Sequence, residues 1–208
     1  MSAPTRGSPL SGLTRLGAAC LEIAERLGDF SRLTLQTFSS SFGRHFPFRA
    51  LLEQFEAIAV RSLPIVAVTT FFTGMVLALQ TAFALSRFGA KPYVGSIVGL
   101  AIVRELGPVL AALMVGGRVG AGITSELGSM VVTEQVDAIR AMGADPIQKL
   151  VVPRVVATTL ALPLLTFFAI SLGVLGGGII AKTQYSISFF FYMQTVLTAV
   201  TLPDFFSG

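Results

Sequence analysis

The chain has 208 residues, of which 53% are apolar and 12% charged, and its formal net charge is +4. Average proteins carry about 25% charged residues, so this chain lacks the charge that covers a soluble domain. Its mean hydropathy of +0.77 also indicates a membrane protein. A single cysteine and a single histidine exclude a disulfide scaffold and a histidine-based metal site. The basic residues are scattered along the chain, which argues against a nucleic-acid partner.

Residues 1–61 are expected to form a separate region at the membrane surface. Apolar residues recur at spacings of three and four over 10–30, while Glu22 and Glu25 fall largely on other faces. This pattern predicts an amphipathic helix whose charges favour the membrane interface over a span. A helix packed on another domain is the alternative. Residues 46–61 repeat the amphipathic pattern.

Three membrane helices follow in the sequence. Uncharged runs of 25 residues (Ser62–Ser86) and 27 residues (Val155–Ala181) exceed the roughly 20 residues that a bilayer core requires. Between them, residues 93–128 are apolar apart from Arg104–Glu105, and we expect one long helix there with a bend near Pro108.

Small residues recur at every fourth position of these helices, which favours close helix packing. The glycines concerned are Gly74, Gly116, Gly120, Gly128, Gly173 and Gly177. The glycine-rich segment 116–122 does not fit a phosphate loop, because no lysine follows it. We therefore expect no cofactor on this chain, and any ATP that drives it would be bound by another subunit.

A short helix is predicted over residues 133–142, between the second and third spans. Thr133 is a plausible N-cap, and Gly143 is a natural C-terminal stop. The apolar residues that share one face are Val136, Ile139 and Met142. With charges beside this face, the helix suits docking to a partner, although a passive connection is the alternative.

The positive charges predict the orientation in the membrane. Of the 15 lysines and arginines, seven precede the first span, and four lie at the end of the second span or between the second and third. Arg87, Lys91 and Lys182 lie on the opposite side. The bias places the N-terminus and helix 133–142 in the cytoplasm. The polarity of the run 183–203 disfavours a further span there, and we expect a surface hairpin or interfacial helices on the other, periplasmic side, with a span as the alternative.

The dipeptide Arg104–Glu105 is the strongest chemical signal in the spans. Each charge costs about 2.5–3.5 kcal/mol in mid-membrane, and neighbouring side chains on a helix point about 100° apart. Each therefore needs a partner on another helix or a wet cavity. A polar patch in a translocation path and a structural interhelical ion pair both satisfy this need. No catalytic constellation or metal-ligand cluster appears, so we do not expect an enzyme.

Several motifs together resemble the MlaE family of ABC-transporter permeases. The segments that carry the resemblance include GMVLALQ (74–80), RELGPV (104–109), SELG (125–128), TEQ (133–135) and LPLL (162–165). The match covers roughly residues 45–208, with a long ungapped run from 104 to 165. The resemblance implies that residues 62–208 are an all-α permease domain.

This resemblance implies a multi-pass permease of the bacterial inner membrane that works as a homodimer. Cytoplasmic ATPase subunits would drive it, an MCE-domain protein would bind on the periplasmic side, and phospholipid or a related lipid would be moved between the inner and outer membranes. The family pattern continues with two further membrane helices, so we expect a fragment or a truncated gene product. The alternative function is a stand-alone secondary transporter or channel, which gives helix 133–142 no special role.

The resemblance also assigns residues to two sites. The residues expected to contact the lipid are Leu77, Ala84, Leu85, Phe88, Arg104, Glu105 and Leu106. The residues expected to couple the permease to its ATPase are Glu134, Val136, Asp137, Ile139, Arg140 and Met142.

Overall fold

A computed structural model of the chain describes residues 10–41, 48–201 and 203–204, where its regular structure is helical. The long helices are α1 (Leu10–Ser41), α2 (Phe48–Ser86), α4 (Gly107–Val132) and α6 (Val152–Tyr185). The shorter helices are α3 (Val94–Ala101), α5 (Gln135–Ala141) and α7 (Phe189–Ala199). A 3-10 turn η1 (Lys91–Tyr93) and the π turns η2 (Ile102–Leu106) and η3 (Ile147–Val151) lie between them.

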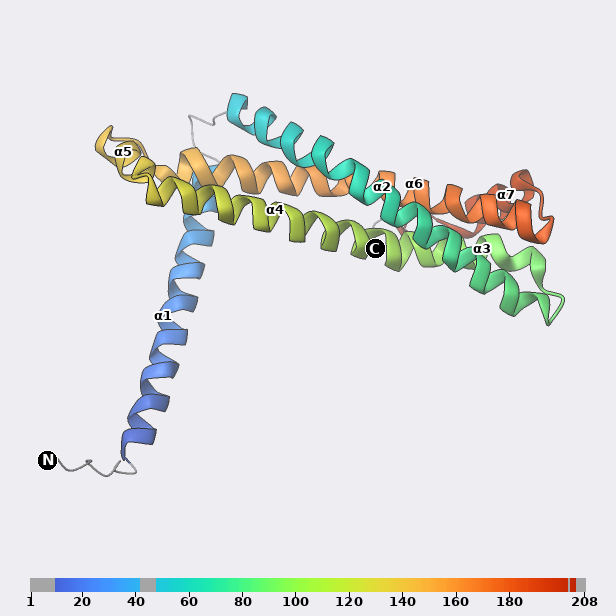
Figure 1. Ribbon diagram of the computed structural model, residues 1–208, viewed down its shortest axis with the longest axis horizontal. Helices are drawn as coiled ribbons and strands as arrows, with labels where there is room; N and C mark the ends of the chain where they lie inside the picture. The colour runs from blue at the N-terminus through green and yellow to red at the C-terminus, as the bar shows by residue number, and fades with distance from the viewer. Residues whose placement is uncertain (1–9, 42–47, 202, 205–208) are drawn as a thin grey trace, which may run out of the picture.

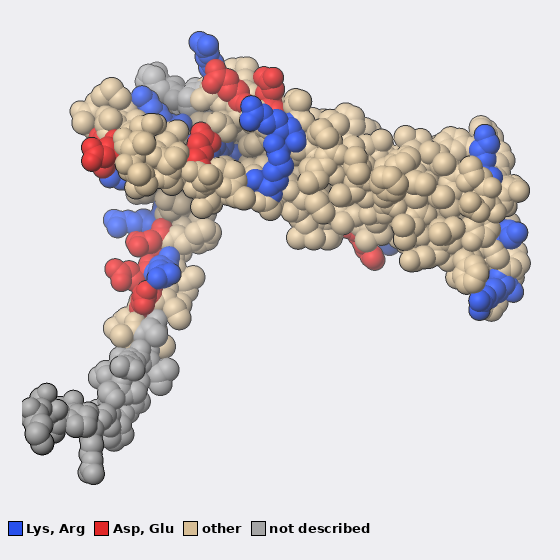
Figure 2. Space-filling model, viewed as in Figure 1, with Lys and Arg blue, Asp and Glu red and all other residues tan. Residues whose placement is uncertain are grey.

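Helices α2, α4 and α6 pack side by side, with α5 at one end of the bundle and α3 and α7 at the other (Figure 1). The segments Phe48–Ser86, Lys91–Val132 and Ile147–Tyr185 are long and apolar enough to cross a membrane, which confirms the three predicted spans. Charged side chains gather towards the two ends of the bundle, and the broad band between them is uncharged on this face except for one small charged patch at its lower margin (Figure 2). Helix α1 leaves the bundle sideways near the start of α6 (Figure 1).

The surface segment expected over 46–61 is not separate from the first span. Helix α2 runs unbroken from Phe48 to Ser86, across the boundary expected at residue 61 and through Pro64. The reason is a continuous buried stripe, since Leu51 and Ile58 pack in the same core cluster as Val66.

The irregularity expected near Pro108 is a π turn that directly precedes it. Proline lacks an N–H and crowds the carbonyl four residues earlier. In η2 the chain makes room with one extra residue in the turn, because the Gly107 N–H bonds to the Ile102 carbonyl. The same arrangement recurs before Pro153, where the Val152 N–H bonds to the Ile147 carbonyl.

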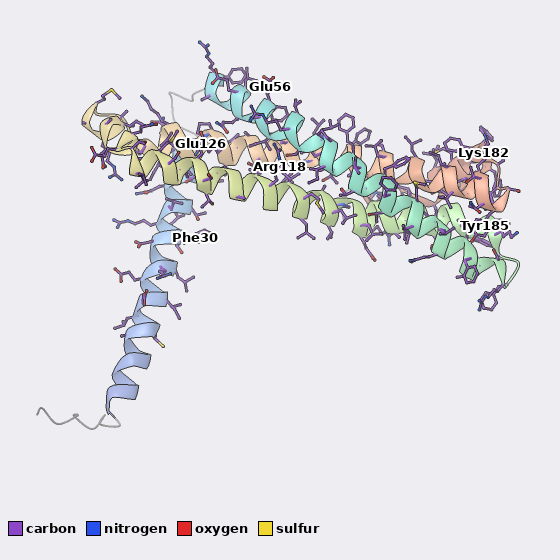
Figure 3. The ribbon with its side chains drawn as sticks, viewed as in Figure 1. Phe30, Glu56, Arg118, Glu126, Lys182 and Tyr185 are labelled. Carbon is purple, nitrogen blue, oxygen red and sulfur yellow. The ribbon has the colours of Figure 1, made fainter. Side chains whose placement is uncertain are left out.

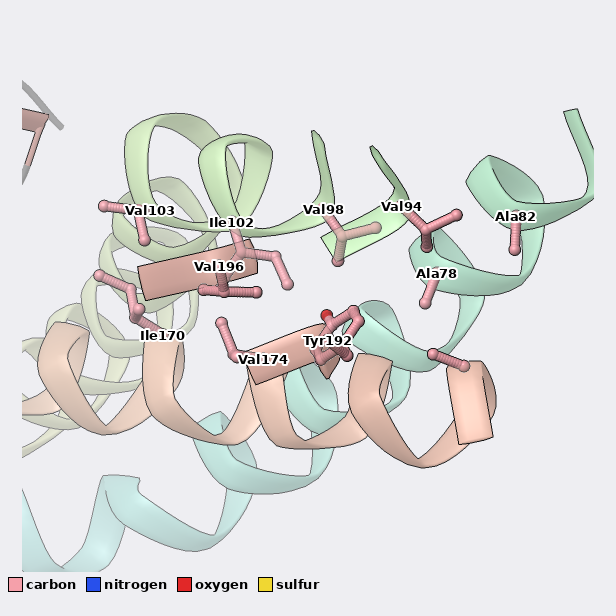
Figure 4. Packing of buried hydrophobic residues seen from close by; sticks show 11 residues of the cluster. Ala78, Ala82, Val94, Val98, Ile102, Val103, Ile170, Val174, Tyr192 and Val196 are labelled. Atoms are coloured by element: carbon pink, nitrogen blue, oxygen red, sulfur yellow. The ribbon is translucent and has the colours of Figure 1, made fainter. Parts of the chain in front are cut away.

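The run 183–203 forms a helical hairpin, but the expectation that it lies on the surface was wrong. Helix α7 packs on α3 and α6, and the side chain of Tyr192 is fully buried among valines of these helices (Figure 4). Sequence polarity misled the prediction because the threonines bond within their own helix. The hydroxyl of Thr195, for example, donates to the Tyr192 carbonyl at 2.7 Å.

Three of the six glycines predicted to mediate packing do so. A Cβ atom on Gly74 would lie only 2.8 Å from Cα of Gly173, where α2 crosses α6, and one on Gly177 would meet the Tyr192 hydroxyl. Gly116, Gly120 and Gly128 have no atom of another helix within 4 Å of their Cβ positions. Among the described residues, no helix packs against these three α4 glycines, so their predicted packing role stays a prediction.

Candidate functional site

Arg104 belongs to η2, in the middle of the uncharged band, and forms an ion pair with Asp204. The Arg104 Nε donates to Oδ1 of Asp204 at 2.8 Å, and Nη2 donates to the same oxygen. Asp204 follows α7 in the chain, so the helical hairpin brings this carboxylate back to the centre of the bundle. The pair joins residues 100 positions apart and ties η2 to the hairpin.

Asp204 is held as a carboxylate by more than its arginine. Its Oδ2 accepts hydrogen bonds from the backbone N–H and the hydroxyl of Thr201, both at 2.7 Å. These bonds and the Arg104 guanidinium hold the carboxylate in one position. The side chain of Asp204 is 4% exposed, whereas that of Arg104 is 55% exposed. The Arg104 guanidinium is thus held by Asp204 on one side and exposed on the other. Its predicted contact with a transported lipid stays a prediction.

Glu105 is exposed next to this pair. Among the described residues, no ion pair involves its carboxylate. The two adjacent charges therefore do not neutralise one another, as their helical spacing predicted. A carboxylate exposed at mid-membrane depth requires a polar surrounding, which this single chain does not supply.

An apolar cavity of about 340 Å³ lies beside the polar residues, between α6 and α7. Val103, next to Arg104, and Val200, shortly before Asp204, contribute to its wall. Phe167 and Met193 line it from the two helices. The centre of the bundle thus places a charged group next to an apolar cavity. This combination suits an amphiphile, whose polar head and apolar tail need different surroundings.

The apolar residues predicted to contact lipid do not gather in one place. Leu77 and Leu85 are half-buried and pack against the core cluster around Tyr192. Ala84 and Phe88 face outward, and Phe88 is 83% exposed. Leu106 is half-buried at the end of η2. Their role as a joint lining stays a prediction, because in this chain they face both inward and outward.

The predicted short helix between the second and third spans is present as α5, shorter than expected. Thr133 is not its N-cap. Instead α4 continues to Val132, and the Thr133 hydroxyl donates to the Ser129 carbonyl at 2.8 Å. The chain then turns through Glu134, which has a left-handed φ of 57°. The predicted stop at Gly143 is confirmed by its φ of 75°, a conformation that favours glycine.

The side chains of α5 present a mixed surface at the end of the bundle (Figure 1). Val136 and Ile139 are half-buried, whereas Met142 is 73% exposed. Arg140 donates from Nη1 to Oδ1 of Asp137 at 3.2 Å across one helical turn. An exposed methionine beside a surface ion pair is a reasonable docking surface, but no partner chain tests it.

Asp204 is the functional residue that the sequence interpretation missed. It is the last acidic residue, and the only one after Asp145. Because an arginine in a span needs a partner, the single acidic residue near the end of the sequence could have been predicted to pair with Arg104. Among the described residues no cluster of histidine, cysteine or acidic side chains could hold a metal.

Comparison with known proteins agrees with this architecture. The family described as Permease MlaE matches residues 51–208. A "Probable ABC transporter permease protein" of Rickettsia felis is 40% identical over 87% of this chain and 73% of its own length. The "Intermembrane phospholipid transport system permease protein MlaE" of Haemophilus influenzae is 34% identical over 88% of this chain and 71% of its own. The chloroplastic "Protein TRIGALACTOSYLDIACYLGLYCEROL 1" of Arabidopsis thaliana is 36% identical over 77% of this chain and 46% of its own length. With three spanning helices and a family match over most of its length, the chain belongs to the MlaE permease family.

Proposed function

We propose that this chain is the permease subunit of an ABC transporter that moves phospholipids or related lipids between the inner and outer membranes of a bacterium. The family match over residues 51–208 carries the proposal, and the name of the Haemophilus influenzae relative supplies the cargo class. The charged residues beside an apolar cavity in the middle of the bundle fit an amphiphilic cargo.

The proposed partner on the cytoplasmic side is an ATPase subunit that binds α5. The relatives named ABC transporter permeases support such a partner. Met142 is exposed and apolar at the end of this helix, and Glu134, Asp137 and Arg140 are exposed charged residues of the same helix and the turn before it. ATP would then be bound and hydrolysed by the partner, and this chain would carry no nucleotide site of its own.

A homodimer and a periplasmic MCE-domain protein complete the proposed assembly. The exposed Glu105 supports the homodimer, because a second copy facing it could enclose a polar cavity around both carboxylates. The open glycine face of α4 supports it as well, since helices approach each other closely over such residues. The inner membrane is the proposed location of this assembly.

The test is affinity purification of the tagged chain from its host membrane, with mass spectrometry of the proteins and lipids that accompany it. Recovery of an ATPase, an MCE-domain protein and phospholipid is the expected result. Met142→Asp should abolish recovery of the ATPase without affecting membrane insertion, because it places a charge on the docking surface. Unchanged recovery of the ATPase with Met142→Asp would remove α5 from the proposal.

A further inference from the structure

Helix α1 meets the bundle at one edge of the uncharged band. It contacts η3 and the start of α6, directly before the uncharged run Val155–Ala181 of the third span. From there it runs sideways from the bundle instead of along its axis (Figure 1). Arg118 lies towards this edge of the band and Lys182 towards the other, well apart along the bundle (Figure 3). Since the spanning helices are long enough for a bilayer core, α1 lies at the level of one membrane surface.

The two sides of α1 differ in polarity. Its charged side chains lie on the side that faces away from the band (Figure 2). At about 100° per residue they share one side of the helix, and they are Glu22, Glu25, Arg26, Asp29 and Arg32. Exposed apolar side chains occupy the opposite side, among them Ile23, Leu27 and Phe30. This orientation fits the interfacial helix that the sequence predicts, with its apolar side towards the bilayer.

An apolar cavity of about 500 Å³ lies in the corner between α1 and α6. Its wall includes Phe30, Leu33 and Phe38 of α1, and Val155, Val156 and Leu160 of α6. From Val151 at the end of η3 to Leu160, the cavity follows the chain for about 14 Å. Because these α6 residues come after the contact of α1 with η3 and belong to the third span, the cavity lies on the bilayer side of α1.

The polar groups in the wall of the cavity are already satisfied. Its threonine hydroxyls donate within their own helices, that of Thr34 to the Phe30 carbonyl at 2.8 Å and that of Thr159 to the Val155 carbonyl at 2.9 Å. Among the described residues that line the cavity, none is charged. A free anion or a polar peptide therefore gains neither an ion pair nor a hydrogen bond there, whereas an acyl chain requires neither.

We propose that this cavity holds one acyl chain of a phospholipid from the bilayer leaflet nearer α5. A hollow that opens to the bilayer and stays empty forfeits dispersion contacts on both of its walls, and a lipid chain is the apolar group available at that depth. The chain would pack between Phe30 of α1 and Leu160 of α6 and so hold α1 at its sideways angle to the bundle.

This site is separate from the polar centre of the bundle. Arg104 and the cavity beside it involve η2, α6 and α7 in the middle of the band, whereas the proposed site lies at the edge of the band, outside α6. It does not depend on the proposed transport function, because it requires only the chain and a bilayer.

The experiment is fluorescence quenching of the full chain in vesicles of phosphatidylcholine whose acyl chains carry bromine, a contact quencher of tryptophan. The chain contains no tryptophan, so a single one can be placed at will. Leu160→Trp reports from the wall of the cavity, and Leu164→Trp is the matched control one turn further along α6, outside the cavity. Both leucines are exposed, by 54% and 44%, and both reporters should be quenched.

The decisive variant is Thr34→Phe, which fills the cavity from α1. It should remove a large part of the quenching of the Leu160→Trp reporter and leave that of Leu164→Trp unchanged, because the added ring takes the place of the acyl chain. Gln36→Phe adds the same ring on the charged side of α1, four residues after Arg32, and should leave both reporters unchanged.

Three outcomes would overturn the proposal. The first is unchanged quenching of Leu160→Trp after Thr34→Phe, which would show that only the surrounding bilayer reaches this residue. The second is quenching of Leu160→Trp by aqueous acrylamide instead of the brominated chains, which would indicate a cavity filled with water. The third is protection from both quenchers, which would indicate a protein occupant such as a second copy. If Thr34→Phe fails to give a helical protein in vesicles, Thr34→Leu replaces it and should remove a smaller part of the quenching.

Discussion

Replacing Gly74 by alanine should separate α2 from α6, the two helices that form the central contact of the bundle. The added Cβ would lie 2.6 Å from the carbonyl carbon and 2.8 Å from Cα of Gly173, whereas ordinary contact begins at 3.4 Å. Both neighbours are backbone atoms, so no side chain can rotate away. The Gly173 carbonyl oxygen would lie closer still. The helices must therefore part by at least about 0.8 Å at this crossing, a gap that forfeits about a quarter to a half or more of the dispersion attraction across it.

The expected loss of stability is about 1–3 kcal/mol, the usual cost of overpacking a core. Alanine is also the better helix former by up to about 1 kcal/mol, and this gain partly offsets the cost of the clash. A matched control is therefore needed to separate the two contributions to the free energy of unfolding. Gly116→Ala provides that control, because it makes the same chemical change on α4 where no atom lies within 4 Å of the Cβ position. It should leave stability unchanged or slightly raise it.

The assay is unfolding in mixed micelles of increasing denaturing-detergent fraction, followed by far-ultraviolet circular dichroism and by tyrosine fluorescence of the buried Tyr192. Gly74→Ala should unfold at a lower detergent fraction than the wild type, and Gly116→Ala should not. If both variants unfold together with the wild type, the close approach of α2 and α6 at Gly173 is refuted.

Three further predictions concern other parts of the molecule. Asp204→Asn and Arg104→Gln should each lower stability, and the double variant should cost less than the sum of the two in a double-mutant cycle, because both remove one ion pair. Gly143→Ala should speed hydrogen exchange in α5, since it forces alanine into a φ of 75° at a cost of about 1–2 kcal/mol. Gly120→Ala should not lower the stability of the single chain, because no described atom of another helix lies within 4 Å of its Cβ position, but it should weaken self-association measured by analytical ultracentrifugation, if the open α4 face pairs two copies.

The spans could be predicted from the sequence because their signal is local. An uncharged run longer than a bilayer is visible in any window of the chain, and Ser62–Ser86 needed no tertiary knowledge. The every-fourth spacing of Gly74 and Gly173 was local as well. The spacing does not indicate which helix a face of small residues packs against. For this reason Gly116 and Gly128 have the same every-fourth spacing as Gly74 and Gly173, but no described helix packs closely against them.

The errors arose where distant residues decide the structure. The hairpin 183–203 looked polar along the chain, yet Tyr192 and Val196 lie one turn apart and bury themselves against valines nearly 100 positions earlier. The partner of Arg104 was missed for the same reason, since Asp204 returns to it only after α7 has folded back. Composition and periodicity indicate which helix faces are apolar. They do not indicate which turn of the chain brings Asp204 to Arg104.

A single helix connects the proposed coupling helix with the charged centre of the bundle. Helix α4 runs without interruption from Gly107, next to η2, to Val132, one turn before α5. Because an unbroken helix transmits a displacement along its axis, a partner that moves α5 would move the other end of α4 at Gly107, next to the π turn that holds Glu105. At that end the π turn replaces the regular hydrogen-bond pattern, and such turns occur frequently at functional sites. An unbroken helix that ends on a π turn beside Arg104 and Glu105 would suit a subunit that receives force at one end and alters a polar site in the middle of the membrane.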